Sequence, residues 1–246
     1  MTAPGFQAVV GQEIKPPSFW QWVADHPHDI LTFLGIHALM AVVAVTIGVL
    51  IAFPLSILAY RRPRSYPPLV WATGFLYTIP SIALFILLIP ATGLSYLTVE
   101  IGLVIYTLLI LLRNFVVGLR SVDADVREAA IGMGYSDRQI LWRVDVPLAL
   151  PAIIAGIRLA TVSTIALVTV GFVIGKGALG QLINTGITRL YLPPVWVGVL
   201  LCIALALGAD ALLLALGRAL MPWSRTRRRR SVVTREVGAR AAEVPT

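Results

Sequence analysis

The chain has 246 residues, of which 58% are hydrophobic and only 13% charged, and its mean hydropathy is +0.85. Soluble domains carry about 25% charged residues and are roughly half apolar, so this composition excludes a protein that faces water on all sides. It disfavours a soluble enzyme, a nucleic-acid-binding module and a disordered regulator, although the formal net charge is +8. The single cysteine, Cys202, lies in an apolar run and excludes a disulfide framework or a cysteine-based metal cluster. The composition indicates an all-α integral membrane protein.

An amphipathic stretch lies within the N-terminal segment, residues 1–34. Its apolar residues are Phe19, Trp22, Val23, Ile30, Phe33 and Leu34, and Pro27 interrupts it. This pattern favours a short helix that lies in the membrane interface on the outer surface.

Five apolar windows follow that are long enough to cross a bilayer, which requires about 20 mostly apolar residues in a helix. They cover residues 35–60, 69–89, 98–118, 148–174 and 195–216. None of them alternates polar and apolar residues as a barrel strand does. We expect these helices to form one transmembrane domain over residues 35–217.

The basic residues are distributed unevenly between the two ends of these spans. With five spans, seventeen of the twenty Lys and Arg residues fall on one side, and only Lys15, Lys176 and Arg189 fall on the other. Because cytoplasmic loops are enriched in Lys and Arg, we expect the N-terminus outside and the C-terminus in the cytoplasm. The basic tail, residues 218–246, is expected to be largely disordered and to contact anionic lipid headgroups rather than nucleic acid.

One polar loop, residues 119–147, is too long to be a simple connection between two packed helices. Asp123 or Asp125 is placed to cap a first helix, whose apolar residues Val126, Ala129, Ala130 and Met133 share one face. Gly134 stands where a left-handed helix terminator belongs. A second helix follows, with a capping box at Ser136 and Gln139 and an end at Pro147. This helix–glycine–helix pattern suits docking into a groove on a soluble partner, and equally a solvated loop with ordinary local helices.

The same loop carries a spaced motif. Glu128-Ala129-Ala130, Gly134, Val144 and Val146-Pro147 follow the spacing of the EAA motif of ABC importer permeases, with valines in place of the motif's Ile and Leu. The wider stretch from Arg113-Asn114 to Ile187 resembles the permeases for osmoprotectants such as glycine betaine, carnitine and choline, and the resemblance covers about residues 30–220.

The resemblance implies a type I importer permease fold in a bacterial inner membrane. Glu128, Ala129, Ala130 and Gly134 would form the coupling helix that contacts a cytoplasmic ABC ATPase subunit. It also implies an external solute-binding protein, which in this family holds the cation–π cage for the solute, and a second permease, either a copy or a similar chain. ATP and Mg would bind the partner ATPase, because this sequence has no G-x-x-x-x-G-K-[ST] loop. We therefore expect no enzyme activity, catalytic residue, metal site or cofactor in this chain.

Two charged residues fall inside predicted spans, Arg158 in the fourth and Asp210 in the fifth. Charges at this depth are costly, so we expect these two to pair or to line a water-filled inner vestibule. Five hydroxyl residues either line the pathway or bond back to their own helices, which is the commoner case: Thr78, Ser81, Thr161, Ser163 and Thr164.

A glycine-rich segment follows the fourth span. Gly175, Gly177 and Gly180 spell G-x-G-x-x-G, but no βαβ unit precedes them and the topology puts them outside the cell, so they do not indicate nucleotide binding. We expect a flexible turn there, an outer gate where the chain re-enters. A stripe of small residues in the fourth span permits close helix packing, either within the subunit or against a second permease: Ala152, Gly156, Ala160 and Thr164. His37 is expected to be a packing residue.

The sequence as a whole predicts the permease subunit of an ATP-driven importer for glycine betaine or related quaternary ammonium compounds. The alternatives are an ABC permease for another small solute such as methionine or a polar amino acid, an intramembrane enzyme acting on lipid, and a membrane scaffold. The enzyme is disfavoured because no intramembrane His, Asp or Glu pair stands at catalytic spacing.

Overall fold

The computed structural model describes residues 18–221, and all regular structure in that part of the chain is helical. Four helices in it are long and apolar enough to cross a membrane. They are α3 (Pro27–Arg61), α6 (Tyr96–Arg120), the continuous helix Asp137–Ile174 built around α9 (Val146–Val170), and α11 (Leu192–Leu220). A bent pair, α4 (Tyr66–Thr78) and α5 (Ser81–Thr92), passes the same test when its two helices are taken together, which gives the fifth span. The fold is the predicted all-α membrane bundle.

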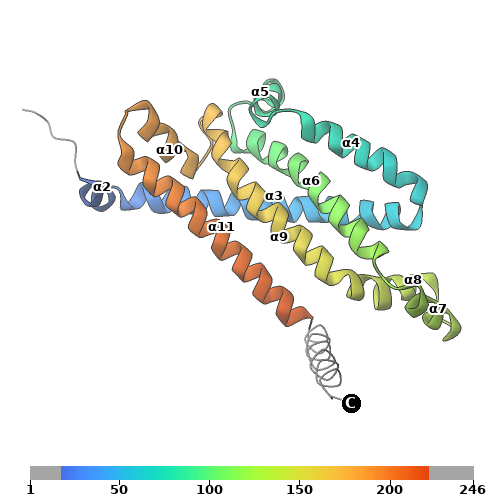
Figure 1. Ribbon diagram of the computed structural model, residues 1–246. Helices are drawn as coiled ribbons and strands as arrows, with labels where there is room; N and C mark the ends of the chain where they lie inside the picture. The colour runs from blue at the N-terminus through green and yellow to red at the C-terminus, as the bar shows by residue number, and fades with distance from the viewer. Residues whose placement is uncertain (1–17, 222–246) are drawn as a thin grey trace, which may run out of the picture.

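The remaining elements are short. They are α2 (Phe19–Asp25), the 3-10 turns Pro63–Ser65 and Gly171–Ile174, α7 (Ala124–Gly132), α8 (Asp137–Ile140), a π-helical turn Leu141–Asp145 and α10 (Leu179–Thr188). In Figure 1, α2 and α10 lie at one end of the molecule, and α7 and α8 lie at the opposite end.

The second span differs from the uninterrupted helix predicted over residues 69–89. The chain bends by 94° between α4 and α5. The cause is Pro80, whose ring keeps the preceding residue out of the helical region, so that Ile79 is extended at φ −66° and ψ 125°. Hydropathy alone does not predict this break, because α4 and α5 are both apolar.

The predicted N-terminal surface helix is also shorter than expected. α2 starts at a capping box formed by Ser18 and Gln21 and ends at Asp25, and the next helix begins at Pro27. Proline is favourable in the first turn of a helix, where its missing N–H is not needed. Residues 27–34 therefore belong to the first span rather than to a separate surface helix.

α6 is the central helix of the bundle. It packs against α3, α4, α5 and α9, and more than half of its apolar window is buried. Small residues bring its neighbours close, since a Cβ at Gly48 of α3 would collide with Thr107, and one at Gly102 would lie 2.5 Å from the Phe85 ring of α5. By contrast, no residue of the apolar window of α11 is fully buried, so this helix keeps part of its surface exposed while it packs against α9 and α10.

The small-residue stripe of the fourth span packs inside the subunit. A Cβ at Gly156 would lie 2.5 Å from Asn114 Cβ, and one at Gly118 would lie 2.8 Å from Ala152. The stripe therefore lets α9 pack closely against α6. Of the two alternatives that the sequence left open, packing within the subunit or against a second permease, the structure shows the first. His37 is buried and its Nε2 lies 2.9 Å from the carbonyl oxygen of Ile165, so it joins α3 to α9 as a packing residue.

Candidate functional site

The polar loop forms a rigid helix–turn–helix segment, residues 123–145, at one end of the bundle (Figure 1). We refer to it as the coupling segment. Its first helix, α7, starts at Asp123, whose side chain accepts a hydrogen bond of 3.1 Å from the Asp125 N–H. An acid at that position also suits the positive end of the helix dipole.

Gly134 ends α7 with φ +81°, in the left-handed region that glycine tolerates best. Two backbone bonds close the turn, from Gly134 N–H to Ile131 O at 2.9 Å and from Tyr135 N–H to Ala130 O at 3.1 Å. This pair of bonds is the Schellman pattern and satisfies two carbonyls that the helix end would otherwise leave free. The turn predicted from the sequence is therefore present with the expected geometry.

The second helix begins as predicted, with Ser136 and Gln139 forming a capping box. Its predicted end at Pro147 is wrong, because the helix runs on without interruption into α9. A π-helical turn at Leu141–Asp145 lies just before the proline, and the Val146 N–H bonds to Leu141 O, five residues back. This wider turn accommodates the residue that lacks an N–H, so the second helix of the coupling segment and the fourth span form one continuous helix, Asp137–Ile174.

The outer face of α7 is apolar and uncovered. Met133 is 67% exposed, Ile131 61% and Val126 44%, and Glu128 and Ala129 are exposed as well. Ala130, which we expected on the contact surface, is buried and packs against the protein, so it is not available to a partner in this conformation. Exposed apolar side chains on a short helix that is capped at both ends are typical of a surface that a partner covers.

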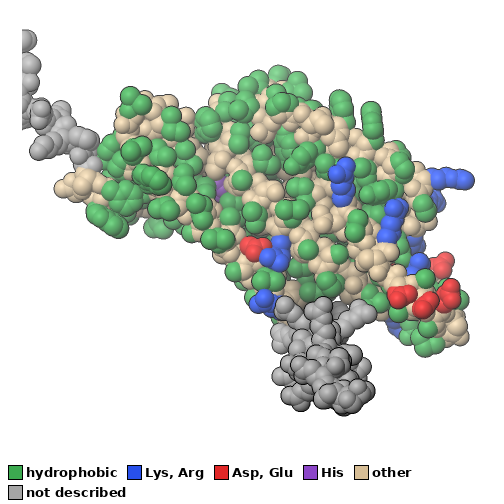
Figure 2. Space-filling view, in the orientation of Figure 1, with side chains coloured by type: hydrophobic (Ala, Val, Ile, Leu, Met, Phe, Trp, Pro, Cys, Tyr) green, Lys and Arg blue, Asp and Glu red, His purple; other side chains and the backbone are tan. Residues whose placement is uncertain are grey.

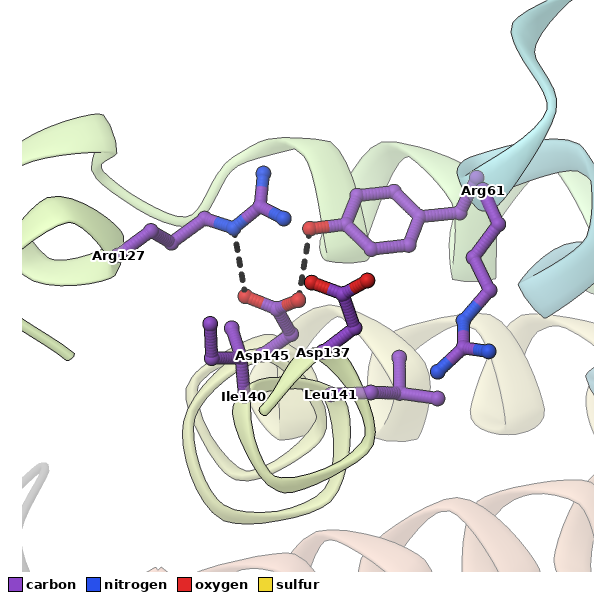
Figure 3. Close-up of a pocket in the computed structure, with 7 residues that line it drawn as sticks. Arg61, Arg127, Asp137, Ile140, Leu141 and Asp145 are labelled. Carbon is purple, nitrogen blue, oxygen red and sulfur yellow. Dashed lines mark hydrogen bonds and ion pairs between the residues drawn. The ribbon is translucent and has the colours of Figure 1, made fainter. Parts of the chain in front are cut away.

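A buried carboxylate holds this segment to the bundle. The Asp145 side chain is 2% exposed, accepts a hydrogen bond of 2.8 Å from the Tyr60 hydroxyl, and lies 3.3 Å from Arg127 Nε (Figure 3). The Arg127 guanidinium also lies over the Tyr60 ring, 5.4 Å from its centroid. The Tyr60–Asp145–Arg127 cluster thus connects α7, the π-helical turn and the end of α3, beside a cavity of about 320 Å³ lined also by Arg61 and Asp137.

The sequence analysis missed this cluster. The signal was present, since Asp145 is an acid set between valines at the start of a predicted span, but its partner Tyr60 lies 85 positions away. A second missed group is Glu100, in the first turns of α6, whose Oε1 is buried and has no hydrogen-bond partner among the described residues.

Arg158 and Asp210 meet across α9 and α11. The contact is bidentate, with Nε to Oδ1 at 2.8 Å and Nη2 to Oδ2 at 2.7 Å. Two parallel charge-assisted bonds fix both the distance and the orientation of the two helices. The structure brings these two predicted residues together as a pair, and both remain partly exposed.

The hydroxyl residues divide between two regions. Thr161 and Thr164 on α9 donate to the carbonyl oxygens of Ile157 and Ala160, which is the back-bonded arrangement. Thr78 donates to Phe75 O at 2.7 Å and lines a groove beside α4, and Ser81 begins α5 just beyond the bend. Ser163 is half-buried on α9, away from that groove.

The glycine-rich loop that follows the fourth span is closely packed. Gly175 has φ +73° and turns the chain after the fourth span. A Cβ at Gly177 would collide with the Phe172 backbone, and one at Gly180 with the Thr169 backbone. These two glycines let α10 fold back onto the end of α9, as expected for a chain that re-enters, and the flexibility of this turn stays a prediction.

Five apolar spans, one of them broken at mid-length, with a rigid exposed segment at one end, define the class of the molecule as a multi-pass membrane permease. The chain belongs to the family described as binding-protein-dependent transport system inner membrane component, whose family model matches residues 26–222. It is therefore an ABC importer permease of the inner membrane.

Curated relatives include three transport permeases. The carnitine transport permease of Listeria monocytogenes is 36% identical over 71% of this chain and 79% of that protein. The osmoprotectant import permease of Salmonella typhimurium is 36% identical over 76% of this chain and 89% of that protein. A choline transport system permease of Bacillus subtilis is 32% identical over 84% of this chain and 92% of that protein.

Solved structures share the fold. A chain of the MetNI methionine ABC transporter, crystallised in an inward-facing conformation, superposes with a TM-score of 0.71 at 20% identity, over 78% of this chain and 95% of that chain. A chain of an amino acid ABC transporter superposes with a TM-score of 0.65 at 19% identity.

Proposed function

We propose that this chain is the transmembrane subunit of an ATP-driven importer for glycine betaine or related quaternary ammonium osmoprotectants. The observation that carries the transport role is the coupling segment, whose exposed helix α7 begins the EAA motif and is held by an ion pair between Arg127 and the buried Asp145 carboxylate. The substrate class is supported by the relatives named for carnitine, choline and osmoprotectant import.

The exposed face of α7 is the surface that a cytoplasmic ATPase subunit contacts. The small residue Ala129 permits close approach, and Ile131 and Met133 supply apolar contact area. Because α8 continues into α9, a displacement of the segment by the ATPase moves the fourth span with it. The ATPase supplies ATP hydrolysis, and this chain supplies the pathway.

A second permease subunit, identical or similar, completes the pathway. In the described chain, α11 and α5 carry many exposed large apolar side chains, which lipid or another subunit covers. An external solute-binding protein delivers the solute to the end of the molecule that carries α2 and α10.

The charges support the orientation in which the coupling segment is cytoplasmic. Figure 2 shows Lys, Arg, Asp and Glu side chains gathered toward the end that carries α7 and α8, while the α2 and α10 end is mainly apolar. The basic tail that we expect to contact anionic lipids lies mostly beyond residue 221, outside the described residues. An N-terminus outside and a C-terminus in the cytoplasm follow from the positive-inside rule.

The test is uptake of labelled glycine betaine by bacterial cells that lack their own betaine transporters. The cells express this chain with its neighbouring ATPase, binding protein and any second permease. ATP-dependent uptake that choline or carnitine competes away would support the proposal. An assembled complex that hydrolyses ATP but takes up methionine or a polar amino acid instead would overturn the substrate class and leave the permease role.

A further inference from the structure

A groove with a cavity volume of about 760 Å³ lies between α4 and α6, and it plays no part in the coupling segment. Its lining includes four aromatic residues, Tyr66, Trp71, Phe75 and Tyr77, together with Gly74, Thr78 and Arg113. It runs along α4 toward the bend that separates α4 from α5.

One wall of the groove offers aromatic faces. Trp71 is 74% and Phe75 59% exposed, and their rings stack in nearly parallel planes, 13° apart, with centroids separated by 5.9 Å. Between them along the helix, Gly74 has no atom within 4 Å of the position that a Cβ would occupy. The missing side chain therefore leaves open space beside the two rings.

The opposite wall carries a cation without a partner. Arg113 is exposed on α6 and forms no ion pair or hydrogen bond with any described residue. It lies seven residues before Arg120, the end of the helix, which is about 10 Å into the span. A guanidinium at that depth is costly unless it faces water, an anion or another subunit.

The end of the groove is a broken helix. The carbonyl groups of the last turn of α4 leave a partial negative charge there, and the first turn of α5 begins at Ser81 without a side-chain cap. The Ile79 carbonyl between them accepts a hydrogen bond from the Tyr106 hydroxyl, which holds the bend against α6. Interrupted helices inside a membrane provide fixed partial charges for solutes that carry charge.

We propose that this groove is a contact site for the transported solute within the membrane, and that it accepts a zwitterion with a quaternary ammonium and a carboxylate. Arg113 donates hydrogen bonds to the carboxylate, and the faces of Trp71 and Phe75 contact the ammonium by cation–π attraction. The inference rests on the proposed function, because it assigns to the groove the solute class named there.

The experiment compares two solutes in the same uptake assay, glycine betaine, which has a carboxylate, and choline, which does not. Arg113→Gln is expected to lower the maximal uptake rate of glycine betaine relative to that of choline at least about tenfold, because only the first solute loses a charge-assisted hydrogen bond. Arg113→Lys keeps the charge and restores part of that ratio. Trp71→Leu is expected to lower the uptake of both solutes.

Arg64→Gln and Trp196→Leu are matched controls, since both side chains are exposed and lie outside the groove. They are expected to leave the ratio unchanged. ATPase activity of the purified complex establishes that each variant has assembled.

Equal loss of both solutes in Arg113→Gln, or no change in either, would overturn the groove assignment while leaving the proposed function intact. Failure of that variant to associate with the second permease would overturn it too, and would identify the groove as a subunit interface. If the unaltered complex transports neither solute, the proposed function itself is wrong.

Discussion

Replacement of Gly134 tests whether the turn of the coupling segment matters for transport. The residue has φ +81°, and no atom lies within 4 Å of the position that a Cβ would occupy. A side chain there therefore meets no steric obstacle, and its only cost is backbone strain. For an L-residue in the left-handed region this cost is about 1–2 kcal/mol, which changes the ratio of closed to open turn by roughly five- to thirtyfold.

We expect Gly134→Ala to weaken the turn by this amount and Gly134→Val to weaken it more, because β-branched residues tolerate positive φ poorly. Gly134→Asn should retain more function than either, since asparagine visits the left-handed region readily. The bundle itself stays folded, because its core is formed by the packing of α6 against α3, α4, α5 and α9. Uptake is therefore lost while the protein remains in the membrane.

The assay pairs solute uptake with hydrogen exchange at the Gly134 and Tyr135 amides, the two donors that close the turn. Gly132→Ala is the matched control, because Gly132 is also unobstructed but lies within α7, where alanine is favoured over glycine by about 1 kcal/mol. It should leave the protection of these amides unchanged or raise it. Unaltered protection and normal uptake in Gly134→Val would refute the reasoning.

Three other predictions follow from the packing. Tyr60→Phe removes one of the two partners of the buried Asp145 carboxylate and is expected to lower the local stability of α7 by about 1.5–3 kcal/mol. The loss is measured as faster amide exchange in α7, and unchanged exchange there would contradict the cluster's role. Reversing the charge of Arg158 or of Asp210 alone should lower the yield of folded protein, and the double reversal should restore it if the pair is structural. Gly180→Ala should lower the thermal stability of the purified protein, because the new Cβ collides with the backbone of Thr169. A midpoint of thermal unfolding equal to that of the unaltered protein would argue against close packing of the glycine-rich loop.

The candidate site was predicted from the sequence where its geometry is local. The cap at Asp123, the capping box at Ser136 and the left-handed Gly134 each depend on residues a few positions apart, so the backbone conformation follows from the local chemistry. The pairing of Arg158 with Asp210 was one of two alternatives expected because both are charges inside predicted spans. The cluster around Asp145 was not, because nothing in the residues near Tyr60 indicates that its hydroxyl reaches a distant carboxylate.

The prolines Pro80 and Pro147 separate what the sequence alone determined from what the tertiary structure decided. It determined the apolar lengths of the spans, the polar coupling segment between them and the asymmetry of the basic residues, because each depends on the transfer of side chains between water and lipid. It did not determine that the chain breaks at Pro80 and runs on through Pro147. Both prolines lack an N–H, but at Pro147 a π-helical turn absorbs the defect, whereas at Pro80 the bend is stabilised by the hydroxyl of Tyr106 on another helix. Tertiary packing therefore decided which proline bends the chain.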